Sequence, residues 1–143
     1  VESAFTASRA ALPGMMKLGA GRIVNVASIA GLKGYAYVSA YCAAKHAVIG
    51  LTRALAAELV KTRITVNALC PGYTDTDLIA NAAATISTKT GLAAQKAIDH
   101  FARTNPAGRL ITPQEVANAA LWLCSEGASA VTGQAITIAG GDL

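Results

Sequence analysis

The side chains of Tyr41, Lys45 and Ser28 have the chemistry and spacing that proton transfer to a substrate oxygen requires. Tyr41 and Lys45 stand four positions apart at the start of a run rich in Ala and Leu, so on a helix they project from the same face. The positive charge of Lys45 favours the phenolate of Tyr41, and such a tyrosine can exchange a proton at neutral pH. Ser28 ends an apolar run thirteen positions earlier, and its hydroxyl could hydrogen-bond the same substrate oxygen. This set suits the interconversion of a carbonyl and an alcohol with a nicotinamide hydride.

These side chains depend on a strand, a helix and a second strand that follow one another along the chain. Residues 22–27 and 65–69 are short apolar runs with little polar alternation, a pattern typical of buried parallel strands. Such a unit makes a right-handed crossover, and ligands of parallel sheets bind outside the carboxyl ends of the strands. Ser28 and the pair Pro71-Gly72 each follow a strand, so we expect the chemistry to gather at one edge of the sheet.

Two helices are predicted beside these strands. Residues 2–18 show apolar residues near helical spacing, although Pro13 predicts a kink or an early end. The second helix carries the Tyr and Lys pair, and Ser39 is its predicted N-cap. We expect this helix to run to about residue 61, with one stripe of large apolar side chains and a flank of alanines.

Residues 73–105 differ in composition from the rest of the chain. Thr, Ala, Asn and Ser dominate, and Gly91 divides a weak helix over 78–86 from a stronger one over 92–103. A long insertion with few apolar contacts beside a site commonly serves as a binding loop. We therefore predict that segment 78–104 is a substrate lid.

The last part of the chain is predicted to supply one more helix and one more strand. Thr112 is placed as N-cap, Pro113 at the first helical position and Glu115 at the third, and the helix is expected to reach Gly127. Residues 135–139 are predicted to form the final strand.

Composition excludes several classes of protein. The 143 residues are 53% hydrophobic and 14% charged, which excludes a disordered chain. The net charge of +4 comes from basic residues scattered singly, so no nucleic-acid partner is predicted. No apolar run approaches the ~20 residues of a membrane span and no signal peptide is visible, which predicts a cytoplasmic protein without a membrane partner. Three widely spaced cysteines and two separate histidines indicate neither a disulfide framework nor a metal site.

Four segments give the chain a resemblance to the short-chain dehydrogenase/reductase family. They are residues 21–28 (GRIVNVAS), 41–45 (YCAAK), 64–72 (ITVNALCPG) and the pair 132–134 (TGQ) with 140–141 (GG). The segments occur in the family's order, and the similarity covers nearly the whole chain. The resemblance implies an α/β fold with a Rossmann-like, doubly wound parallel sheet, of which residues 1–143 are expected to be the C-terminal half as a single domain.

The resemblance also implies roles for particular residues. Tyr41 would be the proton donor or acceptor, Lys45 would assist it and bond the cofactor ribose, and Ser28 would orient the substrate. The residues that would contact the cofactor, NAD or NADP, are Tyr41, Lys45, Pro71, Gly72, Thr74 and Thr76. Pro71-Gly72 would let the backbone approach the nicotinamide, and the two threonines would contact its carboxamide and the phosphate end.

Two parts of the family's pattern are expected upstream of this chain. No Gly-x-x-x-Gly-x-Gly turn for the adenine half of the cofactor is found, and the family's catalytic Asn would fall just before Val1. We therefore expect the N-terminal cofactor-binding half to be absent and the chain alone to be catalytically inert. The selector of the cofactor's 2′-phosphate would also lie upstream, so NAD and NADP both stay open.

The function implied is an oxidoreductase that transfers a hydride between NAD(P)(H) and a carbonyl or secondary alcohol. Segment 78–104 and the stretch 105–109 (NPAGR) look most like ketoacyl, polyketide or 3-hydroxybutyrate-type members, which favours a 3-oxoacyl or similar small-molecule ketone. A non-catalytic structural or regulatory member, or an epimerase or dehydratase on the same scaffold, are the alternatives. A homodimer or homotetramer is expected to form through helices 2–18 and 40–61.

Overall fold

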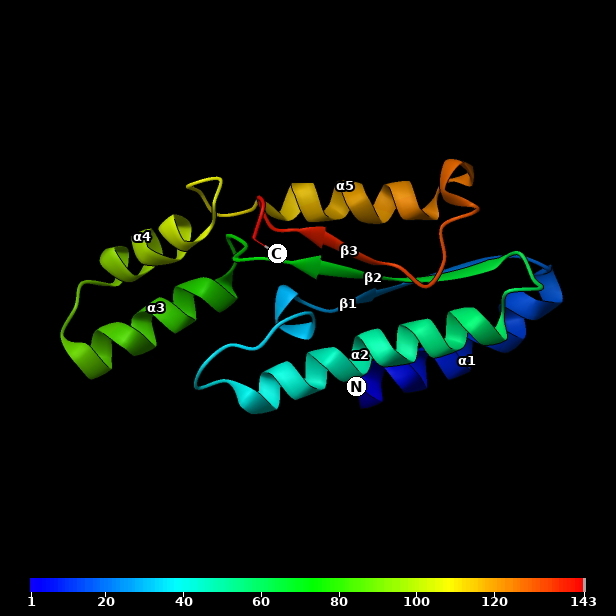
Figure 1. The fold of residues 1–143 in the computed structure, drawn as a ribbon, viewed down its shortest axis with the longest axis horizontal. Coiled ribbons are helices and arrows are strands. Elements are labelled where there is room, and N and C mark those ends of the chain that lie inside the picture. The colour runs from blue at the N-terminus through cyan, green and yellow to red at the C-terminus, as the bar shows by residue number, and fades with distance from the viewer. Residues whose placement is uncertain (143) are drawn as a thin grey trace.

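Helices cover both faces of a three-stranded parallel sheet in the computed structural model, which describes residues 1–142 (Figure 1). The strands lie in the order β1 (Gly21–Val26), β2 (Ile64–Pro71) and β3 (Ala135–Ile138). One face packs on α1 (Glu2–Leu18) and α2 (Ser39–Glu58), and the other packs on α5 (Pro113–Cys124). The predicted α/β fold with a Rossmann-like parallel sheet is confirmed.

The central strand β2 is buried on both faces, as its apolar sequence predicts. Val66, Ala68 and Cys70 pack toward the helices α1 and α2, while Leu69 packs toward Leu123 of α5. This alternation is the two-residue period of a strand, here with apolar side chains in both directions. The strand extends two residues further than predicted, because its pairing with β3 continues to Pro71 opposite Ile138.

Helices α3 (Asp77–Thr90) and α4 (Ala94–Thr104) form a hairpin beyond the carboxyl ends of the strands (Figure 1). Gly91 separates them in the left-handed conformation, with φ 71°, and its N–H closes α3 on the Ser87 carbonyl. The weak first helix is five residues longer than predicted, one at its start and four at its end. Backbone hydrogen bonds between Tyr73 or Asp75 and Ile111, each 2.8 Å long, join the chain where it leaves for the hairpin and where it returns.

The predicted helix over residues 2–18 is confirmed as α1. It does not end early at Pro13, because Leu12 and Met15 on either side of Pro13 pack against the core. Other predicted helix ends are wrong. Ser39 is not an N-cap: the carbonyl of Val38 accepts the first helical hydrogen bond from Cys42, so Ser39 is already helical. Helix α2 ends at Glu58 before a turn, and α5 ends at Cys124 before the short helix η2 (Glu126–Ala128).

The predicted cap of α5 is confirmed as a complete capping box. Thr112 accepts from the Glu115 backbone N–H, and the Glu115 carboxylate accepts from the Thr112 N–H at 2.8 Å. Arg109 binds the same carboxylate in two hydrogen bonds of 2.6 and 2.8 Å. These donors, Arg109 first, lower the pKa of Glu115 to about 2.

Replacing Glu115 with Gln is expected to remove a pH-dependent part of the stability. Because the folded pKa of about 2 lies below the ordinary value of 4.5, the ionised Glu115 stabilises the fold above that ordinary value, and this contribution disappears as the pH falls toward about 2. Chemical denaturation of wild type and variant between about pH 6 and about pH 3 measures it. The difference between the two proteins should shrink on acidification, and a constant difference would contradict the assignment.

Candidate functional site

Tyr41 and Lys45 lie on one face of the first turns of α2, as their spacing predicts. The Lys45 Nζ stands 5.6 Å from the centre of the Tyr41 ring. The same Nζ donates a 3.1 Å hydrogen bond to the Val26 carbonyl at the carboxyl end of β1. An ammonium has three protons, so two remain for other acceptors. The Tyr41 side chain is 43% exposed, and its hydroxyl has no hydrogen-bond partner in the described part of the chain.

Ser28 lies two residues after Val26, the last residue of β1, whose carbonyl anchors Lys45. Its Oγ accepts a 3.1 Å hydrogen bond from the Ala30 N–H and caps the short helix η1 (Ile29–Gly31). The accepted hydrogen bond fixes the side-chain rotamer and leaves the hydroxyl proton available as a donor. The structure therefore gives Ser28 a capping role, and the substrate-orienting role predicted for it stays compatible with the same geometry.

A close backbone contact sets how far η1 lies from α2. A Cβ built on Gly31 would lie 2.7 Å from the Lys45 carbonyl oxygen and 2.8 Å from the Ile49 Cδ1. Only a residue without a side chain fits there, so glycine lets the segment after Ser28 lie against the backbone of Lys45 itself. The sequence pattern did not indicate this role for Gly31.

A buried polar pair attaches the middle of α2 to β1. The Asn25 side-chain amide donates to the Thr52 hydroxyl at 3.0 Å, and this hydroxyl donates to the Val48 carbonyl at 2.9 Å. Thr52 is fully buried and Asn25 is 8% exposed, so both groups need these partners. The pair fixes the position of α2 along β1, and with it the height of Tyr41 and Lys45 above the sheet edge.

Cys70 is a neighbour of the site that the sequence interpretation missed. Burial raises the pKa of this thiol, although a hydrogen bond from the Ser28 backbone and the charges of Arg53 and Lys45 act in the opposite direction. The thiol therefore stays protonated, and it fills space behind Ser28 without acting as a nucleophile. The pairing of the two adjacent parallel strands could have predicted that Cys70 lies beside the carboxyl end of β1, by the same argument that placed Ser28 at this edge.

The predicted cofactor contacts after β2 lie at the same sheet edge. Thr74 donates to the Gly72 carbonyl at 3.0 Å, and Thr76 donates to the Thr74 carbonyl at 3.2 Å. Gly72 has a packing reason of its own, because a Cβ there would lie 3.0 Å from the Cβ of Ala139. Pro71 is still part of β2 and pairs with β3, so it leads to this turn and does not belong to it.

The two histidines have local contacts outside this site. His46 bonds the Cys42 carbonyl one turn earlier at 2.9 Å, and His100 packs near the Phe101 ring. Over residues 1–142, no group of three or more His, Cys, Asp or Glu side chains is arranged to hold a metal ion. The three cysteines are free thiols. No helix in this range is long and apolar enough to cross a membrane.

Comparison with known protein families identifies the class of protein that has this fold and these residues at the carboxyl ends of its strands. A family model described as enoyl-(acyl carrier protein) reductase matches residues 1–142. The chain belongs to the short-chain dehydrogenase/reductase family.

Curated relatives and solved structures agree with this family. A D-beta-hydroxybutyrate dehydrogenase of Cupriavidus necator is 40% identical over 97% of this chain and 54% of its own length. A 3-oxoacyl-[acyl-carrier-protein] reductase of Vibrio cholerae is 40% identical over 97% of this chain and 52% of its own length. The chain thus spans about half the length of the curated relatives it matches.

Two solved reductases have the same fold. One is L-sorbose reductase from Gluconobacter frateurii, complexed with NADPH and L-sorbose, which is 31% identical to this chain. The match covers 100% of this chain and 55% of the reductase chain, with a TM-score of 0.92. The other is an actinorhodin polyketide ketoreductase with NADPH, which is 42% identical to this chain. The match covers 90% of this chain and 49% of the ketoreductase chain, with a TM-score of 0.84.

Gly31→Ala is expected to separate the segment after Ser28 from α2. The new methyl group meets backbone at Lys45, which cannot move as a flexible side chain can, so the variant should lose about 1–3 kcal/mol of unfolding free energy. Gly34→Ala in the same loop is the matched control, since nothing lies within 4 Å of a Cβ there. Denaturant unfolding of both variants measures this, and equal stability of the two would show that the contact is unimportant.

Proposed function

We propose that the intact protein interconverts a carbonyl and a secondary alcohol with NAD or NADP, and that Ser28, Tyr41 and Lys45 carry out the proton chemistry. The observation behind this proposal is the position of the Lys45 ammonium, which is held beside the Tyr41 ring by the Val26 carbonyl. That carbonyl ends the strand that Ser28 follows. Two hydroxyl groups and a cation are thereby attached to one edge of the sheet.

The polar groups of the residues at this edge fit a nicotinamide cofactor. Lys45 retains two protons for ribose hydroxyls, and the hydroxyl groups of Thr74 and Thr76 lie in the turn after β2. Parallel sheets bind nucleotides beyond the carboxyl ends of their strands, where all of these groups lie. When bound, the cofactor supplies or accepts the hydride that changes the oxidation state of the substrate carbon.

Each of these three residues, Ser28, Tyr41 and Lys45, then has a defined role in proton transfer. Ser28 donates a hydrogen bond from its free hydroxyl to the substrate oxygen and so orients the substrate, keeping its own proton, while its Oγ stays fixed by the Ala30 N–H. Tyr41 gives its phenolic proton to this oxygen during reduction and takes the proton back during oxidation. Lys45 stabilises the negative charge that develops on the phenol oxygen through its own positive charge.

A 3-oxoacyl compound or a similar ketone is the proposed substrate class. Relatives are named D-beta-hydroxybutyrate dehydrogenase and 3-oxoacyl-[acyl-carrier-protein] reductase, and both names describe a three-position alcohol or ketone in an acid chain. We also assign the protein to the cytoplasm, where an exposed free thiol such as Cys124 stays reduced.

Tyr41→Phe is expected to lower kcat of the intact protein by about 10²–10⁴-fold, the usual contribution of a general acid or base. Phenylalanine keeps the ring and its packing against Lys45, so cofactor affinity should stay nearly unchanged. Steady-state oxidation of NAD(P)H with a 3-oxoacyl ester, and cofactor titration by fluorescence, measure the two effects. Tyr37→Phe is the matched control because Tyr37 is fully exposed in the same region. Near-wild-type kcat in the Tyr41 variant would exclude the proposed role.

The hairpin of α3 and α4 is proposed to be the substrate lid, segment 78–104. Ala83 and Ala97 are the buried residues of these two helices, which pack mainly on each other. A Tyr73–Phe101 ring contact, with centroids 4.9 Å apart, is their link to the turn after β2. Few buried contacts make a segment easy to displace, as a lid requires.

Hydrogen exchange of the intact protein with and without cofactor and substrate tests the lid. We expect amides of segment 78–104 to exchange faster than those of α2 in the free protein and to become protected on binding. Protection that is equal to that of α2 and unchanged by ligand would refute a lid.

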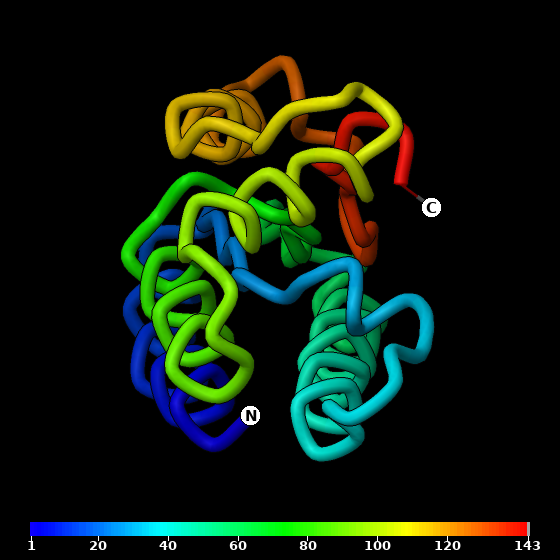
Figure 2. Tube along the Cα trace, turned by 90° about the vertical axis from the view of Figure 1, so that its left-hand side faces the viewer, coloured from blue at the N-terminus to red at the C-terminus, as the bar shows by residue number. Residues whose placement is uncertain are grey.

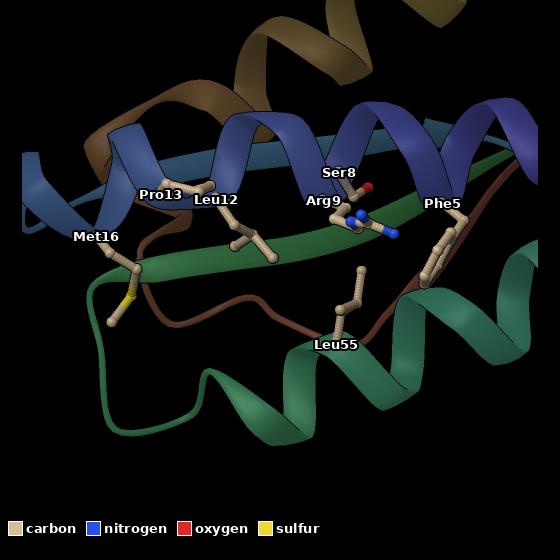
Figure 3. A pocket seen from close by; sticks show the side chains of 7 residues that line it. All are labelled: Phe5, Ser8, Arg9, Leu12, Pro13, Met16 and Leu55. Carbon is tan, nitrogen blue, oxygen red and sulfur yellow. The ribbon is translucent and has the colours of Figure 1, made fainter.

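The exposed face of α1 and α2 is proposed to bind a second copy of the chain in a homodimer or homotetramer. An apolar groove between the two helices is lined by Phe5, Ser8, Arg9, Leu12, Pro13, Met16 and Leu55 (Figure 3). Phe5 and Met16 are about half exposed, at 47% and 53%. Contiguous apolar surface of this kind is typical of sites where proteins associate.

Phe5→Ser is expected to shift the intact protein toward monomers, because it removes the largest apolar side chain of this groove. Light scattering coupled to size exclusion measures the mass over a dilution series. Leu121→Ser removes a 68% exposed side chain from α5 on the opposite face and serves as the control. Equal masses for both variants and the wild type would contradict an interface on α1 and α2.

A further inference from the structure

A second polar cluster lies beside the proposed site and outside its chemistry. The Asp142 carboxylate pairs with the Lys33 ammonium and accepts a 3.2 Å hydrogen bond from the Tyr35 hydroxyl. Lys33 also lies 5.4 Å from the centre of the Tyr35 ring. The side chains of Lys33 and Asp142 are only 34% and 17% exposed, so solvent and salt screen this ion pair less than an ordinary surface pair.

The two residues that Asp142 holds belong to the loop between the proposed reacting groups. Residues 32–38 lead from η1, which Ser28 caps, to the start of α2, which carries Tyr41. In Figure 2 this segment lies on the same side of the molecule as the C-terminal end of the described chain, to which the Lys33–Asp142 ion pair joins it. Tyr37 in the same loop is fully exposed and has φ 67°, so this part gains little from packing. Asp142 therefore anchors the loop that connects the segment of Ser28 with the helix of Tyr41.

The other end of the C-terminal stretch packs against the base of the lid. Asn105 ends α4 and is 3% exposed, and its Oδ1 and Nδ2 occupy the place that a Cβ on Gly140 would need. A Cβ on Gly141 would likewise touch Pro106 at 3.5 Å. Burial raises the pKa of Tyr73 at the front of the lid, and the charge of Asp142 acts in the same direction. The stretch 139–142 thus touches the lid base, the turn after β2 and the loop after η1.

We infer that Asp142 is a positioning residue, which holds the loop 32–38 against the C-terminal stretch beside the substrate site through its contacts with Lys33 and Tyr35. It acts through the loop and makes no contact with the reacting atoms. Lys45 and the turn at 72–76 are attached by other contacts, to Val26 and to β3, so the cofactor side of the site does not depend on it. This inference rests on the proposed function for its kinetic consequence, but its structural part can be tested independently.

The structural test compares hydrogen exchange in the intact wild type, Asp142→Asn and Glu126→Gln. Asparagine keeps the size of the side chain and removes the charge that pairs with Lys33. Glu126 pairs with Arg22 at 3.8 Å near the amino end of β1, so its variant loses an ion pair at the opposite end of the sheet. We expect faster exchange over residues 32–38 in Asp142→Asn alone. Unchanged exchange there would overturn the inference, even if the protein has no reductase activity.

The kinetic test measures kcat/KM for a 3-oxoacyl ester together with cofactor affinity. Asp142→Asn should lower kcat/KM about tenfold, a factor typical for the loss of one charged hydrogen bond, with the cofactor Kd unchanged. Asp142→Glu retains the charge and should recover part of the loss, whereas Glu126→Gln should behave as wild type. A fall in cofactor affinity equal to the fall in kcat/KM, or no effect of Asp142→Asn on kcat/KM, would contradict the positioning role. A wild type without turnover would refute the proposed function and leave the exchange result to decide on Asp142.

Discussion

The contact between the Gly31 backbone and the Lys45 backbone is the constraint on which the proposed site depends. It brings the segment after β1 against α2 with no side chain between them. The Lys45 ammonium can then reach the Val26 carbonyl, and the phenol of Tyr41 stays one helical turn away at the same edge. A wider separation would break this hydrogen bond and leave Ser28 on a segment without a fixed relation to the helix.

Burial of β2 on both faces holds α2 in place and so stabilises the contact between Gly31 and Lys45. The helices α1 and α2 pack on one side of the strand and α5 on the other, so α2 cannot tilt without disturbing the core around Val66 and Ala68. The buried Asn25–Thr52 hydrogen bond adds a polar constraint that fixes α2 along its own axis. Rigid elements thus carry Tyr41 and Lys45, while the proposed lid and the loop 32–38 are attached by fewer contacts.

The features that depend on local sequence were predictable, and those that join distant residues were not. Spacing along one helix predicted the pairing of Tyr41 with Lys45, and the residues around Thr112 predicted the capping box of α5. The Asn25–Thr52 and Lys33–Asp142 contacts join residues 27 and 109 positions apart, and no periodicity reports such pairs. The prediction of Ser39 as N-cap was wrong, because the preference of serine for this position does not show where the first helical hydrogen bond forms. The Val38 carbonyl accepts that bond, so the helix begins one residue earlier. The helix over residues 2–18 was predicted correctly, but the early end expected at Pro13 does not occur, because core packing of α1 outweighs the loss of one hydrogen bond.

A comparison of Tyr41→Phe, Lys45→Met and the double variant tests most directly whether the two residues act as one unit. The measured quantity is kcat of the intact protein with substrate and cofactor both saturating, which removes any effect of Lys45 on cofactor affinity. If Lys45 acts on proton transfer through the phenol of Tyr41, the double variant should be no slower than the slower single variant. Losses that multiply in the double variant would contradict this account, because they would show that Lys45 contributes to catalysis independently of Tyr41.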